Sequence, residues 1–348
     1  MIQSHGYAAM SVDAALTPFS FERRGPRPSD VVVEIAYSGI CHSDIHQVKD
    51  EWGGSMFPMV PGHEIVGRVT AVGAEVNRFK VGDLAGVGVM VDSCRVCPNC
   101  TAQHEQYCDK GFVGTYNAKG YDGVLVHGGY ANNIVVDERY VHTLSKKLEA
   151  KLAAVAPLLC AGITTYSPLR HWKVGPGMKV GIVGLGGLGH MGLKFAHSFG
   201  AHVTLFTTSA GKEADARRLG ADEVVISKDA DAMKKQKNSF DFILDCVSAP
   251  HNMNHYLAML KVDGTLCMVG LPPEALSVQA GVLASKRRSL AGSNIGGMQE
   301  TQEMLDYCAE HDIVADIELI PVGKLGEAYE RVLKNDVKYR FVIDIASL

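Results

Sequence analysis

The spacing of apolar residues along the chain changes once, near Gly177. Before that point, short apolar or alternating runs such as Asp30–Ile35 and Glu64–Val69 are separated by turns such as Val81–Asp83. Runs of this length and spacing predict β-strands. The apolar, Ala-rich segment Leu152–Ala161 predicts a helix that leads into the next region. We therefore expect residues 1–152 to form a β-rich, barrel-like domain.

After Gly177, apolar runs of strand length alternate with segments of helical period. The expected strands are Met178–Val183, His202–Phe206, Glu223–Ile226, Phe240–Cys246, Thr265–Val269 and Ser289–Gly292, and the expected helices include Gly189–Phe199 and Lys212–Leu219. This alternation predicts an α/β domain, residues 153–292, with a doubly wound parallel sheet. Residues 293–348 form a mixed tail with a helix at Leu325–Leu333 and a strand at Arg340–Ile345.

Composition narrows the class of protein. The chain has 348 residues, 47% of them hydrophobic, and a net charge of -4. A weak acidic charge does not attract nucleic acid or an anionic membrane. We find no apolar run long enough to span a bilayer and no signal-peptide pattern at the start, so a cytoplasmic protein is expected. In that compartment nine cysteines indicate metal binding or catalysis rather than disulfides.

Four cysteines lie close together in the segment 94–108, namely Cys94, Cys97, Cys100 and Cys108. Short spacings let thiolates converge on one ion, and four of them suit tetrahedral zinc. Unrelated buried cysteines, a redox dithiol and an iron–sulfur cluster are weaker alternatives, the last because its usual spacings differ. Because sulfur fills all four positions, this site is expected to be structural.

Cys41, His63 and Cys160 are candidates for a second metal site. Two Cys and one His leave one tetrahedral position open, as catalytic zinc requires. Their spacing alone does not distinguish ligands from buried core residues.

A glycine-rich segment follows the first strand of the α/β region. Gly184, Gly186 and Gly189, with Gly187 and Leu188 between them, form a G-x-G-x-x-G pattern that opens a helix. That context favours dinucleotide binding over a simple glycine turn, because the backbone can approach a pyrophosphate at the helix N-terminus.

The end of the next strand indicates which dinucleotide binds. It carries Thr207, Thr208 and Ser209, then Lys212, and no acid before Glu213. An acid there holds the ribose of NAD, whereas hydroxyls and a cation accommodate the 2′-phosphate of NADP. Helix capping is the alternative role for the hydroxyls. We expect NADP(H).

Taken together, these motifs resemble the zinc-containing medium-chain alcohol dehydrogenases, most of all the cinnamyl alcohol dehydrogenase branch. The segments that carry the resemblance are Gly39–Asp44, Pro61–Glu64, the four-cysteine segment, Leu159–Thr164, Gly184–Gly189 and Lys338–Phe341. The resemblance implies a GroES-like catalytic domain interrupted by a Rossmann domain, with the tail returning to the catalytic domain and a cleft between the two. It also implies a homodimer that joins Rossmann sheets near Ser289–Asn294.

The resemblance also implies roles for individual residues. Cys41, His63 and Cys160 hold a catalytic zinc ion, with Glu64 beside it and Asp44 orienting the histidine; Ser43 and His46 relay the proton. Thr164, Gly270, Ser293 and Ile295 lie near the nicotinamide, and Arg340 contacts the cofactor phosphates. Trp52 falls where the family places an aromatic wall of the substrate pocket, and Met56 and Met90 are further candidates for that pocket. Ordinary surface or core packing is the alternative for Ser43, His46, Arg340 and the three pocket residues.

The sequence thus predicts an NADP-dependent alcohol dehydrogenase, acting as an aldehyde reductase on aromatic or medium-chain aldehydes, with two zinc ions per chain. An NAD-linked polyol dehydrogenase and a non-enzymatic, zinc-stabilised binding protein are the alternatives. The missing acid near Thr208 argues against the first, and the pair Ser43 and His46 against the second. The metal residues contradict a zinc-free quinone reductase, and the few basic residues of the four-cysteine segment argue against nucleic-acid binding.

Overall fold

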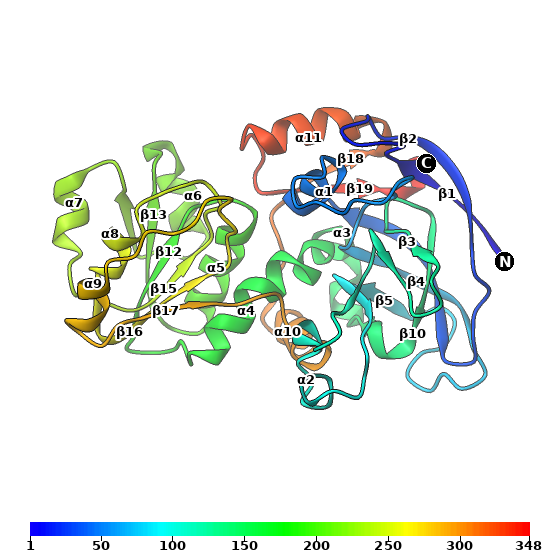
Figure 1. Cartoon of the computed structure of the whole chain (residues 1–348), viewed down its shortest axis with the longest axis horizontal. Helices are drawn as coiled ribbons and strands as arrows, with labels where there is room; N and C mark the ends of the chain where they lie inside the picture. The colour runs from blue at the N-terminus through cyan, green and yellow to red at the C-terminus, as the bar shows by residue number, and fades with distance from the viewer. The chain divides into compact units, whose positions relative to one another are not determined.

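The computed structural model describes all residues, 1–348. The chain divides into two compact units, one formed by residues 1–163 with 296–348 and one by residues 164–295 (Figure 1). The first unit is therefore discontinuous in sequence, because the second is inserted between two of its parts.

The first unit is built around a seven-stranded sheet with the order β11-β5-β4-β3-β19-β18, on which β10 also pairs with β3. The strands of this unit are β1 (Ile2–Ala8), β2 (Thr17–Arg23), β3 (Asp30–Gly39), β4 (Ile65–Val72), β5 (Leu84–Val87), β6 (Met90–Asp92), β7 (Val113–Gly114), β8 (Ala118–Lys119), β9 (Leu125–Val126), β10 (Asn133–Asp137), β11 (His142–Thr143), β18 (Ile317–Pro321) and β19 (Arg340–Asp344). The expected β-rich region is confirmed, and the expected last strand is present one residue shorter.

Short helices surround this sheet. They are α1 (His42–Val48), α2 (Pro98–Thr101), α3 (Leu152–Val155), the 3₁₀ turn η4 (Ala156–Leu159), α10 (Met298–His311) and α11 (Leu325–Leu333); α4 (Ala161–His171) begins in this unit and lies mostly in the second. The single helix expected over Leu152–Ala161 is wrong, because α3 ends before Pro157 and η4 ends before Cys160. Pro157 has no N–H to continue the α-helical ladder. The expected domain boundary at 152 also differs from the division above, since α3 and η4 pack on β3, β4 and β19 of the first unit.

Strand pairing brings distant segments together at one end of the sheet. β3 runs antiparallel to both β4 and β19, with Ser38 opposite Ile65 and Gly39 opposite Val342. The end of β3 therefore lies beside the starts of β4 and β19. Cys41 follows the end of β3, His63 precedes the start of β4, and Arg340 is the first residue of β19.

The second unit contains a six-stranded parallel sheet with the order β14-β13-β12-β15-β16-β17. Its strands are β12 (Lys179–Val183), β13 (His202–Thr207), β14 (Glu223–Ile226), β15 (Phe240–Asp245), β16 (Leu260–Met268) and β17 (Ser289–Gly292); its helices are α5 (Gly187–Ser198), α6 (Glu213–Arg218), α7 (Ala230–Lys235), α8 (Met253–Leu257) and α9 (Ala280–Ala284). Numbered along the chain, this order is 3-2-1-4-5-6, the Rossmann arrangement. The predicted doubly wound parallel sheet is confirmed.

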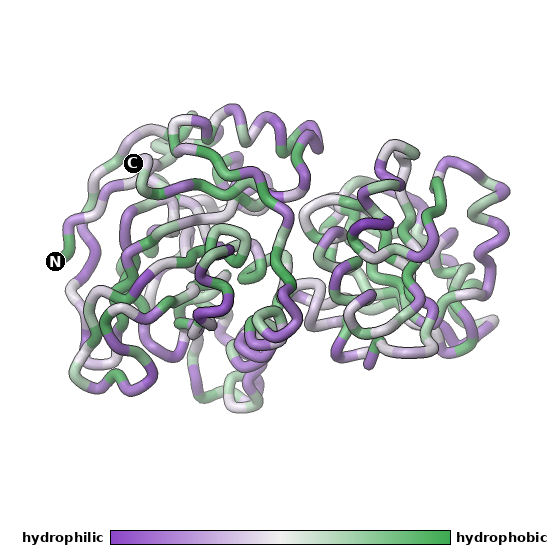
Figure 2. Tube along the Cα trace, turned by 180° about the vertical axis from the view of Figure 1, so that it is seen from behind, coloured by the Kyte–Doolittle hydropathy of each residue, from purple (hydrophilic) through white to green (hydrophobic).

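Apolar strands make the core of this second unit. Phe206 of β13 and Phe240 and Ile243 of β15 are buried with Leu257 and Leu266 in one cluster. Hydrophobic stretches accordingly run through the interior in Figure 2. No single helix of the chain is long and apolar enough to cross a membrane; one bent pair, Lys146–Leu159 with Ala161–His171, has that length and composition.

Candidate metal and active site

Four buried side chains of the first unit gather at the sheet end just described. The donor atoms of Cys41, His63, Glu64 and Cys160 all lie within 4.8 Å of one another, and the Sγ atoms of Cys41 and Cys160 are 3.8 Å apart. Cys41 follows β3, the pair His63–Glu64 precedes β4, and Cys160 stands between η4 and α4. Two thiols, an imidazole and a nearby carboxylate are a donor set that fits zinc with one open position.

Asp44 fixes the orientation of this group. It is fully buried, and its Oδ1 accepts hydrogen bonds from Nδ1 of His63 and from the backbone N–H of Gly62, both at 3.1 Å. Its Oδ2 accepts from the backbone N–H of Cys41 at 2.8 Å and from the Tyr130 hydroxyl at 3.1 Å. Because Nδ1 of His63 donates to Asp44, Nε2 is left with its lone pair for a metal. The contact expected between Asp44 and the metal-site histidine is therefore present.

The electrostatics of the group suit metal binding. A hydrogen bond from Cys160 lowers the pKa of Cys41, and the same bond raises the pKa of Cys160. Burial opposes the charged form of His63, but the Asp44 carboxylate outweighs it and raises the pKa of His63 to about 10. A carboxylate that makes an imidazole more basic also makes it a stronger ligand.

Glu64 lies between the ligand group and Arg340. Its Oε1 accepts a hydrogen bond from Nη2 of Arg340, and its Oε2 is buried without a protein partner. An unpartnered carboxylate oxygen within reach of two thiols and an imidazole is a further sign that a cation belongs here. Arg340 is 6% exposed, and its Nε is also unpartnered. The expected contact of Arg340 with cofactor phosphates stays a prediction.

The predicted relay residues lie on α1, next to Cys41. The hydroxyl of Ser43 is 3.6 Å from the Cys41 sulfur. His46 lies one turn further along α1, is partly exposed, and its Nδ1 pairs with the Glu51 carboxylate. Trp52 is half exposed, with its ring 5.0 Å from the His46 ring.

The two methionines predicted for the substrate pocket differ in burial. Met56 is partly buried and donates its backbone N–H to the Asn117 side chain at 2.7 Å. Met90 is buried at the start of β6. The pocket itself stays a prediction for both residues and for Trp52.

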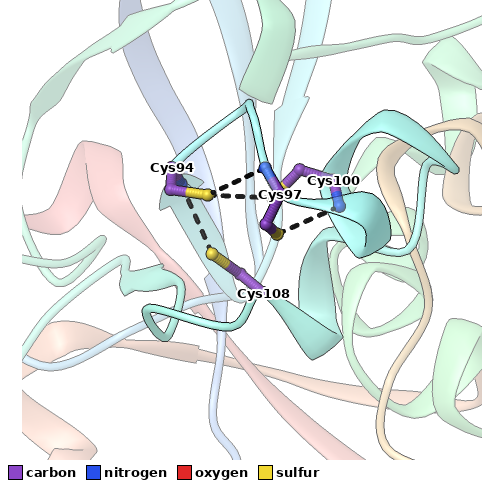
Figure 3. A group of neighbouring side chains, drawn as sticks. All are labelled: Cys94, Cys97, Cys100 and Cys108. Carbon is purple, nitrogen blue, oxygen red and sulfur yellow. Dashed lines mark hydrogen bonds between the residues drawn. The ribbon is translucent and has the colours of Figure 1, made fainter.

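The four cysteines of segment 94–108 form a second donor group (Figure 3), and the donor atoms of Cys94, Cys97, Cys100 and Cys108 all lie within 4.8 Å of one another. The sulfurs accept backbone hydrogen bonds, such as Cys97 N–H to Cys94 at 3.4 Å and Cys100 N–H to Cys97 at 3.5 Å. Backbone donors of this kind lower the pKa of Cys94 to about 6. Four convergent sulfurs leave no position open for a substrate, so the group fits a structural zinc ion.

The glycine-rich segment stands where a pyrophosphate is expected. It connects the end of β12 to the N-terminus of α5, at the topological switch between β12 and β15. A Cβ on Gly186 would meet nothing within 4 Å, so the backbone there is bare. A Cβ on Gly189 would lie 1.9 Å from the Gly184 carbonyl oxygen, so helix and turn can pack this closely only with glycine. The segment, including Gly187 and Leu188, therefore fits a dinucleotide.

The predicted 2′-phosphate residues have different environments. Thr207 is buried, and its hydroxyl accepts the Ser209 N–H at 3.3 Å, so it shapes the turn. Thr208 and Ser209 are exposed. Lys212 reaches back to the glycine-rich segment, where its Nζ donates to the Leu185 carbonyl at 2.7 Å. The strand end thus carries two exposed hydroxyl residues, followed by a lysine whose ammonium group reaches the glycine-rich segment.

The first acid after this strand, Glu213, does not take the place of these hydroxyl residues and the lysine. Glu213 is exposed on α6 and pairs with Arg217 at 2.9 Å. Its carboxylate is therefore engaged along the helix, which agrees with the expected absence of an acid at the strand end.

The predicted nicotinamide residues all belong to the second unit. Thr164 is buried at the start of this unit, and Ile295 is buried at its end. Gly270 follows β16 and donates its N–H to the Asp245 carbonyl at 3.1 Å, while Ser293 donates its N–H to the Met268 carbonyl at 3.1 Å. Their contacts with a cofactor stay predictions.

The sequence did not indicate two tyrosines of the metal group. Tyr130 donates to Asp44, and the Tyr116 ring stacks on His63 with centroids 5.8 Å apart. Neither lies in a recognisable ligand spacing, and only the fold brings them to His63. The Gly128–Gly129 pair before Tyr130 is the one local feature of the sequence that indicates close packing of the backbone at this tyrosine.

Two family models match the chain. Residues 27–146 match the alcohol dehydrogenase GroES-like domain, and residues 187–310 match the zinc-binding dehydrogenase domain. The expected resemblance to the zinc-containing alcohol dehydrogenases is therefore confirmed.

Similar proteins agree with the family models. The chain is 57% identical to the aldehyde reductase YahK of Escherichia coli, over 98% of this chain and 97% of that protein. It is 54% identical to the NADP-dependent alcohol dehydrogenase C of Mycobacterium tuberculosis, over 98% of each.

Solved structures extend the agreement to the fold. A cinnamyl alcohol dehydrogenase of Sorghum bicolor is 44% identical with a TM-score of 0.96, covering 99% of this chain and 98% of that one. A cinnamyl alcohol dehydrogenase of Helicobacter pylori, solved with NADP(H), is 42% identical with a TM-score of 0.93 and covers 99% of each chain. With its two donor groups and its Rossmann unit, the chain belongs to the zinc-containing alcohol dehydrogenase family.

Proposed function

We propose that this chain reduces aldehydes to primary alcohols with NADPH, in a reversible reaction. The observation that carries the proposal is the buried group of Cys41, His63 and Cys160, with Asp44 on the far side of the imidazole. The names of the relatives support it, since one is an aldehyde reductase and another an NADP-dependent alcohol dehydrogenase. One aldehyde, one NADPH and one proton give one alcohol and one NADP⁺.

Three side chains would hold the catalytic zinc ion, and Glu64 would stand next to it. When bound, zinc supplies a Lewis acid that polarises the aldehyde oxygen, and NADPH supplies the hydride. The chain itself shields these four side chains from bulk solvent, because all of them are buried. Asp44 holds the His63 ring so that its Nε2 faces the two thiols.

Two residues of α1 would move the proton. Ser43 would pass its hydroxyl proton to the product oxygen, since this hydroxyl is 3.6 Å from the Cys41 sulfur. His46 would exchange the proton with solvent through the cofactor ribose, because it is partly exposed and an imidazole ring can both accept and donate a proton.

The choice of NADPH rests on the end of β13. Thr208, Ser209 and Lys212 would surround the 2′-phosphate, whereas no carboxylate is free there to hold the hydroxyl of NAD. Glycine-rich backbone at Gly186 would face the pyrophosphate. Thr164, Gly270, Ser293 and Ile295 would lie around the nicotinamide.

The remaining parts of the proposal concern pocket, assembly and location. Trp52, Met56 and Met90 would form an apolar wall for aromatic or medium-chain aldehydes. A homodimer would form through β17, which is the edge strand of the parallel sheet and so offers unpaired backbone groups. Nine free cysteines, six of which lie in the two donor groups, fit a reducing, cytoplasmic location.

Isotope transfer tests the proposal. Zinc-loaded protein is incubated with benzaldehyde and NADPH that carries deuterium at C4, on either face in separate samples. We expect deuterium at C1 of benzyl alcohol from one labelled face only. Because some relatives are named probable mannitol dehydrogenases, mannitol with NAD⁺ is run in parallel. If no deuterated alcohol forms and mannitol reduces NAD⁺, the result would instead support the NAD-linked polyol dehydrogenase.

A further inference from the structure

The loop 246–252 connects β15 to α8 at the carboxyl edge of the parallel sheet. The N–H of Cys246 donates to the carbonyl of Val183, the last residue of β12, at 3.1 Å, and the Ser248 hydroxyl accepts the N–H of Leu271 at 3.2 Å. The loop is thus bonded to the end of β12 and to the segment that follows β16. Because dinucleotides bind at this edge of a Rossmann sheet, the loop belongs to the surroundings of the proposed cofactor site.

Val247 is the loop residue that packs against the glycine-rich segment. A Cβ on Gly184 would lie 2.6 Å from Cγ2 of Val247, and a Cβ on Gly270 would lie 2.5 Å from the Val247 carbonyl oxygen. The loop therefore rests on the first glycine of the G-x-G-x-x-G pattern and on a glycine predicted to lie near the nicotinamide. A displaced Val247 would leave the backbone at Gly184 without this support.

The carboxylate of Asp245 ties this loop to the end of β15. Asp245 is completely buried, its Oδ1 accepts the N–H of Val247 at 3.1 Å, and its Oδ2 accepts a hydrogen bond from Nε2 of His251 at 2.8 Å. His251 is therefore the counter-charge of this carboxylate, and it stands at the other end of the loop. A buried carboxylate that loses its cation is costly, so the contact between His251 and Asp245 fixes the course of the loop.

Both ring nitrogens of His251 face acceptors. Nδ1 lies 2.9 Å from the Ala249 carbonyl oxygen, and Nε2 lies 2.8 Å from Oδ2 of Asp245. Carbonyl and carboxylate oxygens only accept hydrogen bonds, so both nitrogens carry a proton and the ring is an imidazolium. In agreement, the hydrogen bond to Asp245 raises the pKa of His251. A neutral ring has a single N–H and can keep only one of the two bonds.

The other titratable groups around this pair are neutral near pH 7. The ring of Tyr256, on α8, lies 5.7 Å from the His251 ring, and burial raises the pKa of Tyr256 to about 12. Burial also raises the pKa of Cys246, next to Asp245, well above its usual range, and that of Cys267 in β16 to about 12. His251 is therefore the group of this cluster whose charge changes as the pH rises above neutrality.

We propose that His251 is a positioning residue for the dinucleotide: as an imidazolium bonded to Asp245, it holds the loop 246–252 against Gly184. The proposal rests on the proposed function, since it takes the glycine-rich segment as the cofactor site. When the pH rises through the pKa of His251, the ring loses a proton and one of its two hydrogen bonds, and Asp245 loses its counter-charge. The loop then loosens and the affinity for the cofactor falls. NADPH and NADH should be affected alike, because both carry the pyrophosphate that this segment faces.

Cofactor binding by the zinc-loaded full chain tests the proposal. NADPH and NADH are titrated separately by fluorescence from about pH 6.5 to about pH 9.5, with the wild type and with His251→Gln, which stays neutral throughout. At the lowest pH the Kd of the variant should be higher by about tenfold or more, since a charge-assisted hydrogen bond is lost. The ratio of the two Kd values should fall toward one as the pH rises. His255→Gln is the matched control, because the ring of this exposed histidine of α8 bonds only the Asn252 side chain; its Kd should equal that of the wild type at every pH.

A second measurement needs no variant. In NMR titrations of histidine-labelled protein, the pKa of His251 should be higher in the cofactor complex than in the free protein, because protonation and cofactor binding favour each other reciprocally. A Kd ratio that is the same at every pH would show a merely structural role and overturn the proposal, as would a pKa of His251 that the cofactor leaves unchanged. Neither result would touch the proposed aldehyde reduction, whereas a wild type that binds neither cofactor would refute both proposals.

Discussion

The hydroxyl of Tyr130 donates a hydrogen bond to Oδ2 of Asp44 at 3.1 Å, while Oδ1 of the same carboxylate accepts Nδ1 of His63 at 3.1 Å. Tyr130 is completely buried, and Tyr329 of α11 donates to its hydroxyl at 3.5 Å. The His63 ring is thus held by a chain of hydrogen bonds that starts in the C-terminal part of the sequence.

Tyr130→Phe should therefore loosen the catalytic metal. The variant leaves Oδ2 of Asp44 with one donor fewer, so we expect zinc to leave the Cys41 group several-fold faster; Asp44→Asn, which breaks the contact with His63, should show an effect of about 10- to 100-fold. The measurement is the rate of zinc transfer to a chelator. Tyr140→Phe is the control, because this hydroxyl bonds Ser93 beside the four-cysteine group. Equal rates in Tyr130→Phe and wild type would contradict the role of Tyr130.

The two donor groups should respond differently to loss of a thiol. Cys97→Ser should lower Tm by several degrees, because a structural zinc ion contributes directly to folding. Cys41→Ser should abolish aldehyde reduction with a much smaller change in Tm, because one ligand of an open site is lost. Each variant should hold about one zinc ion per chain by elemental analysis, against about two in the wild type. A similar fall in Tm for both variants would contradict the division into structural and catalytic groups.

Lys212 should decide the preference for NADPH. Lys212→Ala removes the ammonium group beside Thr208 and Ser209, so we expect the Kd for NADPH to rise by about tenfold or more while the Kd for NADH changes little. Fluorescence of the reduced cofactor measures both constants. Arg217→Ala is the matched control, since this exposed cation is already paired with Glu213. Equal weakening for both cofactors would mean that Lys212 supports the glycine-rich segment through Leu185 and not the 2′-phosphate.

His142 should contribute to loss of stability in acid. It is 3% exposed, and burial lowers its pKa to about 3. In the unfolded chain its pKa is about 6.5, so below that value the unfolded state binds a proton that the folded state does not. The free energy of unfolding should therefore fall through this group by up to about 1.4 kcal/mol per pH unit between pH 6.5 and the folded-state value.

His142→Gln removes this dependence. Urea unfolding at pH 6.5 and pH 5.5 should show that the wild type loses about 1 kcal/mol more than the variant over that interval. Parallel losses in the two proteins would show that His142 is protonated in the folded state as well.

Much of the fold could be predicted from local patterns, because apolar runs and glycine turns encode strands and their ends. The six strands of the parallel sheet were found in this way, although β16 begins at Leu260 and not at Thr265. The helix over Leu152–Ala161 was not predicted correctly, since a composition typical of a helix concealed the interruption at Pro157.

The sequence predicted those metal-binding residues of the candidate site that have a characteristic spacing or belong to a family motif. The four-cysteine group follows from spacing alone, whereas Cys41, His63 and Cys160 needed the family resemblance. The pairing of Arg340 with Glu64 and the contact of Tyr130 with Asp44 could not be predicted, because strand register and burial bring them together over long distances in the sequence.

The most direct test of the proposed activity is the initial rate of NADPH oxidation against that of NADH oxidation, with zinc-replete protein and an aromatic aldehyde such as benzaldehyde. We predict rapid loss of absorbance at the reduced-nicotinamide band with NADPH and slow loss with NADH. No oxidation of either cofactor across several aldehydes would contradict the assignment as an aldehyde reductase.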